Sequence, residues 1–145
     1  MTAKQRKDMK KLLSFLMILA LLAGGALAEA VPAPEQVTQI ILRFQETYPD
    51  RYLWSGEDTD FLQTVSDAAF GGLPARRMEP VDYNALRPGD ILRLKNDTYS
   101  VMILEKYDSH VTVVEVWTNG RVYWGRTVNK SAVEAGDYVM TRYPE

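Results

Sequence analysis

The apolar residues of this chain change their spacing at about Leu86, and this change constrains the fold more than any other feature. Before that point, apolar residues recur every three or four positions, as they do on one face of a helix. After it, apolar and polar residues alternate in short runs separated by turn residues, which is typical of strands with one buried face. Helices followed by a series of strands predict an α+β domain.

Two helices are predicted in the first part of the chain. The first spans residues 35–48 and ends at Pro49, which cannot continue a helix. Residues 50–58 are interpreted as a loop, and the second helix spans about 58–70. Residues 74–84 are interpreted as a connection without regular structure.

Five short strands are predicted in the second part of the chain. The strongest turn signal is Asn119-Gly120, because this pair favours a two-residue hairpin loop. We therefore expect two N-terminal helices packed on a five-stranded antiparallel sheet that curls into a half-barrel. The predicted strands are residues 91–95, 99–106, 111–118, 121–128 and 138–142.

The N-terminus has the order of a secretory signal peptide. A patch of five Lys/Arg precedes an apolar run over 12–23, and small residues follow it. We expect a signal peptide over 1–28, with cleavage after Ala28 and a second choice at Ala30, and hence a secreted or extracytoplasmic protein. The alternative is an uncleaved segment that anchors the chain to a membrane, although the run is shorter than the about 20 residues that span a bilayer.

The part of the chain after the leader is acidic and has no cysteine. The whole chain carries −2 and the leader carries five Lys/Arg and one Asp, so the remaining 117 residues carry about −6. An acidic domain is a poor candidate for binding nucleic acid, which requires clustered Lys/Arg. The lack of cysteine removes disulfides and thiolate catalysis, and a single histidine, His110, offers no histidine-rich metal site. No metal or cofactor is predicted.

Several motifs, in order, carry a resemblance to a known family. Residues 86–92 (LRPGDIL) form a turn that leads into a strand, and residues 96–104 and 114–115 lie on the next two strands. These segments resemble the barrel turn, the histidine strand and the third-residue strand of NlpC-type and CHAP-type hydrolases. Those are papain-like cysteine enzymes that cut peptidoglycan, and some secreted bacterial members also resemble residues 119–126 and 137–144. The resemblance implies a domain over 58–145, preceded by a helix and loop over 29–57.

This resemblance also implies that the catalytic machinery is missing. The family's cysteine position falls at or near Asp58, and its histidine position falls at Tyr99. Asp58 suits a helix cap, and a tyrosine, with an ordinary pKa of about 10, cannot replace a neutral imidazole at pH 7. Only Glu115 keeps a polar residue in the third position. We therefore expect an exported pseudoenzyme that binds a peptidoglycan fragment, a peptide or a protein partner.

Two other functions stay open. One is an enzyme with rebuilt hydrolytic chemistry, using Asp58 and Glu115 as paired carboxylates, or a serine or threonine nucleophile with His110 as its base. The candidate nucleophiles are Ser55, Thr59 and Ser100. For His110, however, we favour a solvated turn, and for Glu115, slightly, an exposed strand position. The second open function is a structural or regulatory partner of another exported protein.

Aromatic residues are the candidates for ligand binding. Trp54 is the best of them, because it lies in the loop next to Asp58, and loop aromatics beside a groove often bind ligands. Trp124 is interpreted as a core residue. The binding candidates are Trp54, Tyr99, Trp117 and Tyr123.

The placement of the lost catalytic pair can be tested with a double variant, Asp58→Cys with Tyr99→His. A thiol at a helix N-terminus beside an imidazole has a lowered pKa, so we expect rapid labelling by iodoacetamide at neutral pH. The single variant Asp58→Cys is the control and should react more slowly. An inert thiol in the double variant would contradict the placement.

Overall fold

The computed structural model describes residues 30–55, 58–95 and 100–145, with only the backbone of 58–60. Residues Val31 to Glu145 form one compact unit. No described helix is long and apolar enough to cross a membrane. The described elements are α2 (Pro34–Thr47), α3 (Asp58–Phe70), β1 (Arg76–Met78), η1 (a 3₁₀ turn, Tyr83–Ala85), β2 (Ile91–Arg93), β3 (Ser100–Lys106), β4 (His110–Val116), β5 (Val122–Asn129), α4 (Lys130–Glu134) and β6 (Tyr138–Thr141).

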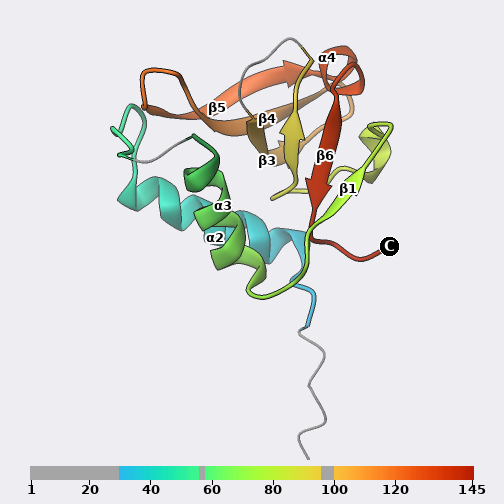
Figure 1. Ribbon diagram of the computed structural model, residues 1–145, viewed down its shortest axis with the longest axis horizontal. Helices are drawn as coiled ribbons and strands as arrows, with labels where there is room; N and C mark the ends of the chain where they lie inside the picture. The colour runs from blue at the N-terminus through green and yellow to red at the C-terminus, as the bar shows by residue number, and fades with distance from the viewer. Residues whose placement is uncertain (1–29, 56–57, 96–99) are drawn as a thin grey trace, which may run out of the picture. The chain divides into compact units, whose positions relative to one another are not determined.

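The fold is α+β, with one antiparallel sheet in the order β1-β6-β2-β3-β4-β5 (Figure 1). Both predicted helices and all five predicted strands exist, with ends that differ by a few residues. The predicted strand count was wrong, because the sheet has a sixth strand, β1, in the segment interpreted as a connection. η1 also lies in that segment, and α4 was not predicted.

One face of the sheet is covered by α2 and α3, which lie side by side (Figure 1). Phe61, Leu62 and Val65 of α3 pack against the sheet with Val37 and Ile41 of α2. Removing each of these five side chains from water stabilises the fold by about 1.5–3 kcal/mol. This helix-covered face is the main core, and its sheet side chains are Met102, Leu104, Val114, Val116 and Val122.

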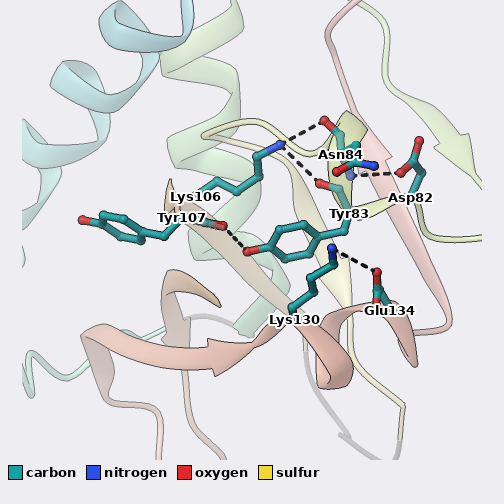
Figure 2. A network of polar contacts seen from close by, with 7 residues as sticks. All are labelled: Asp82, Tyr83, Asn84, Lys106, Tyr107, Lys130 and Glu134. Atoms are coloured by element: carbon teal, nitrogen blue, oxygen red, sulfur yellow. Dashed lines mark hydrogen bonds and ion pairs between the residues drawn. The ribbon is translucent and has the colours of Figure 1, made fainter. Parts of the chain in front are cut away.

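The opposite face carries a second core, closed by η1 and α4. Tyr83 of η1 packs there with Val133 of α4 and with sheet residues such as Ile103 and Val113. The Tyr83 hydroxyl donates a hydrogen bond of 2.5 Å to the carbonyl of Tyr107, and Lys106 Nζ donates to the carbonyl of Tyr83 (Figure 2). Both faces of the sheet are therefore covered, whereas the alternation of apolar and polar residues is typical of strands with only one buried face.

The turn before β2 is held by Gly89 and Asp90. Gly89 has φ +90, and a Cβ at this position would lie 2.7 Å from Val37 Cγ1, so only glycine fits. Asp90 is buried, and its Oδ2 accepts a hydrogen bond of 2.9 Å from Arg87 N. Its Oδ1 is buried without a hydrogen-bond partner. Burial raises the pKa of Asp90 from 3.8 to about 6.

This raised pKa predicts a pH-dependent stability. Between about pH 4 and pH 6 the folded protein keeps a proton on Asp90 that the unfolded chain releases, so the free energy of unfolding falls as the pH rises. Asp90 thereby lowers the free energy of unfolding by about 3 kcal/mol, because the pKa rises from 3.8 to about 6 and one pKa unit is worth about 1.4 kcal/mol. Asp90→Asn keeps an acceptor for Arg87 N and removes this loss.

Urea denaturation from pH 4 to pH 7.5 measures the effect. We expect Asp90→Asn to gain stability over the wild type as the pH rises, whereas Asp108→Asn, which changes an exposed carboxylate, should track the wild type. Parallel pH profiles for Asp90→Asn and the wild type would contradict the prediction.

Candidate functional site

A pocket of about 190 Å³ opens between α3 and the sheet. We call it the α3 pocket. Leu62 and Ser66, one turn apart on α3, form its helix side, and Ile91, Met140 and Ser100 lie on three strands of its sheet side. α3 packs on β3 and β4, and β2 and β6 are the next strands of the sheet beyond β3 (Figure 1). The pocket lining spans this boundary, with residues from α3, β3, β2 and β6. The remaining lining residues are Gln63, Ala75, Gly89, Tyr138 and Arg142.

Within the described part of the chain, Arg142 is the only charged residue that lines the α3 pocket. Its guanidinium donates to the carbonyl oxygen of Gly71, at 3.0 Å, and to the carboxylate of Asp67. Gln63 Nε2 donates to the same carboxylate at 2.9 Å, and these contacts lower the pKa of Asp67. The pocket rim is therefore close to neutral, with hydrogen-bond donors that arise from Gln63 and Arg142.

The two positions that the resemblance assigns to a catalytic pair, Asp58 and Tyr99, lie close in sequence to residues that line this pocket. α3 begins at Asp58, as predicted, and Leu62 follows one helical turn later. Ser100, which lines the pocket, directly follows Tyr99. Tyr99 and the side chain of Asp58 lie outside the described residues, as does the side chain of Thr59.

Glu115 is not an exposed strand residue, and that interpretation was wrong. Its side chain, on the next-to-last residue of β4, is 0% exposed, and both carboxylate oxygens accept hydrogen bonds from Arg126. The Arg126 Nε–Oε1 distance is 2.6 Å and the Nη2–Oε2 distance is 2.8 Å. This bidentate pairing fixes the carboxylate in place and occupies both oxygens. Glu115 therefore acts as one half of a structural ion pair.

A β-bulge at Gly125 brings Arg126 to the face of Glu115. From the hairpin loop to Trp124, the paired residues of β4 and β5 keep one register. Between Val114 and Val113 the register shifts by one residue. Gly125 has φ +83 and no partner in the ladder, so Arg126 lies opposite Val113. If the register did not shift at this point, Arg126 would lie opposite Thr112, on the other face of the sheet.

The predicted ligand-binding aromatics do not form one surface. Trp54 is half-buried and packs on Phe61 and Tyr48, with ring centroids 5.1 and 5.7 Å apart, and its buried Nε1 has no hydrogen-bond partner. Trp117, 41% exposed, packs on Tyr123 at 4.4 Å by the β4–β5 hairpin. None of these three candidates lines the α3 pocket. Trp124 packs against the main core, as interpreted, and is half-buried.

His110 does not lie in a solvated turn, and that interpretation was wrong. It begins β4, is half-buried, and stacks on Tyr107 with ring centroids 4.6 Å apart. Ser100 begins β3 and His110 lies beside the other end of that strand, after Lys106. Six residues of strand place them about 20 Å apart, so His110 cannot serve Ser100 as a base. Ser55 lies on the surface, in the loop before α3.

The site residues that sequence reasoning missed come from four separate elements. Gln63 and Ser66 lie on α3, Ile91 on β2, Tyr138 on β6, and Arg142 directly after β6. No motif links such distant positions, and their only sequence signal is the small or polar character of Ser66 on an otherwise apolar helix face. In the described part of the chain, no group of three or more His, Cys, Asp or Glu could hold a metal ion.

Comparison with protein-family models, with curated proteins and with solved structures finds no match for this chain. The class of the protein therefore follows from its own structure, an α+β domain with a six-stranded antiparallel sheet and a small pocket beside its second helix.

The buried ion pair predicts a large loss of stability when its cation is removed. Arg126→Met leaves the carboxylate of Glu115 buried without its partner, which costs about 3–5 kcal/mol at pH 7. Arg126→Lys is the matched control and should lose less. Urea denaturation at pH 7 measures this, and a loss under about 1 kcal/mol would contradict a structural role.

Proposed function

We propose that this protein is an exported, non-catalytic domain of the papain-like cell-wall hydrolase type, which binds a peptidoglycan fragment or peptide beside α3. One observation carries the proposal: Glu115, at the third family position, is bound through both oxygens to Arg126, while an open pocket is lined by Leu62 and Ser100, which lie close in sequence to the other two positions. A carboxylate held in this way orients no base, and an open pocket can still hold a ligand.

The chain also lacks the groups that hydrolysis through a cysteine or a histidine-activated serine would need. It has no cysteine, and its one histidine lies about 20 Å from Ser100, the candidate nucleophile in the pocket. General-base catalysis needs the base within hydrogen-bond reach of the nucleophile, directly or through one water. Binding without turnover is the function that these positions support best.

A second candidate is docking to another exported protein. Exposed apolar side chains gather where the loop before α3 meets the start of β5. Leu53 forms a bridge with Arg121, Tyr52 O accepts a hydrogen bond from Val122 N, and Trp117 N donates to Arg121 O. Tyr52, Leu53 and Trp117 are each more than 40% exposed. A cluster of this kind is typical of protein contact surfaces.

Binding of the purified full chain to intact peptidoglycan and to defined muropeptides tests the proposal. We expect co-sedimentation with peptidoglycan and saturable muropeptide binding, with substrate masses unchanged by mass spectrometry across pH 4 to 8. Cleavage at any of these pH values would contradict a non-catalytic role. Intact substrates without binding would contradict wall binding and favour the protein partner.

A further inference from the structure

We propose that the α3 pocket receives one uncharged, apolar side chain of a bound peptide, and that the rim of the pocket holds the peptide's carbonyl oxygens. This inference rests on the proposed function and names the ligand chemistry of the same site. It follows from the size of the pocket, its lining and its place beside an edge strand.

The size of the pocket fits one side chain. Its volume of about 190 Å³ is below the range of about 300–1,000 Å³ for pockets that enclose a whole drug-sized ligand. It is close to the about 150 Å³ of an apolar cavity that binds benzene. A saccharide unit with its substituents would not fit, whereas a leucine or methionine side chain would.

The lining selects an uncharged group. Leu62, Ile91 and Met140 form an apolar interior, and Arg142, the only charged lining residue among those that the structure describes, is already paired with Asp67. A carboxylate or ammonium group placed there would lose its hydration without a free opposite charge. Ser66 is only 3% exposed although it lines the pocket, and its hydroxyl makes no hydrogen bond to the described residues.

The rim offers hydrogen-bond donors, which suit the carbonyl groups of a peptide. Arg142 donates hydrogen bonds to Gly71 and Asp67 and has further N–H groups, since a guanidinium carries five. Gln63 donates one N–H to Asp67 and has a second. A purely apolar small molecule would leave these donors without acceptors at the mouth of the pocket.

An edge strand lies next to the pocket. Ala75, a lining residue, directly precedes β1, and β1 pairs only with β6 at the end of the sheet. The outer N–H and C=O groups of such a strand can pair with an added peptide strand. In this mode the main chain supplies affinity, and pockets for alternate side chains supply specificity. The α3 pocket is placed to receive one of those side chains.

Capped peptides of the form acetyl-Ala-X-Ala-amide test the inference, with X = Leu, Gly, Asp, Lys or Phe. Binding to the full chain is followed by NMR titration. We expect the Leu peptide to bind about 10-fold or more tightly than the Gly, Asp and Lys peptides, as for apolar groups that fill a matched pocket. Equal affinities across the series, or a preference for Asp or Lys, would overturn the proposal.

Three variants locate the binding. Ala75→Phe fills the pocket from an exposed position, so it should remove the preference for Leu, whereas Ala132→Phe on the exposed side of α4 should leave it unchanged. Met140→Ala enlarges the pocket and should move the preference from Leu towards Phe, a gain that an unfolded protein cannot produce. Unchanged selectivity in Ala75→Phe would overturn the pocket as the site.

The muropeptide assay separates this inference from the proposed function. Muropeptide binding that Ala75→Phe leaves intact would support the proposed function and overturn the side-chain pocket. Leucine selectivity without any muropeptide binding would support the side-chain pocket and overturn a wall-derived ligand.

Discussion

The ion pair between Glu115 and Arg126 is the interaction on which the β4–β5 side of the sheet depends. A carboxylate with no exposed surface would cost several kcal/mol if it were left without a partner. A single extra residue in β5 allows the partner to reach this carboxylate, because the bulge at Gly125 places the side chain of Arg126 on the face of Glu115. The bulge and the ion pair therefore depend on each other, and both act within the β4–β5 hairpin.

The two faces of the sheet explain where a ligand can reach it. The face opposite the helices is closed by η1 and α4, with Tyr83 held to the end of β3. The other face is covered by α2 and α3, which pack on β3 and, for α3, on β4. The sheet extends beyond the two helices to β2, β6 and β1, and the α3 pocket lies at the boundary of the part that the helices cover. Its position is thus a consequence of two helices covering a wider sheet.

Most elements of the fold could be predicted from local pattern, and the site could not. The helices and the hairpin at Asn119-Gly120 follow from residue spacing and turn chemistry, which act over a few residues. β1 was missed because it has only three residues, two of them arginine, and exists through pairing with β6. Glu115 was misjudged because alternation places polar strand residues in solvent, and neither the second covering layer nor the bulge is visible in the spacing.

The two carboxylates of Asp90 and Glu115 show how burial alone does not decide what an acid can do. Both are almost completely inaccessible. Glu115 has a cation on both oxygens. Asp90 has a backbone N–H on Oδ2 and, among the described residues, no hydrogen-bond partner of good geometry on Oδ1. Burial raises its pKa to about 6 against the opposing effect of the Thr141 side chain. A pKa near neutrality is a common mark of a general acid, yet Asp90 does not line the α3 pocket and closes the turn before β2. We therefore assign both carboxylates to the fold, which leaves the neutral, apolar pocket as the feature most suited to recognising a ligand.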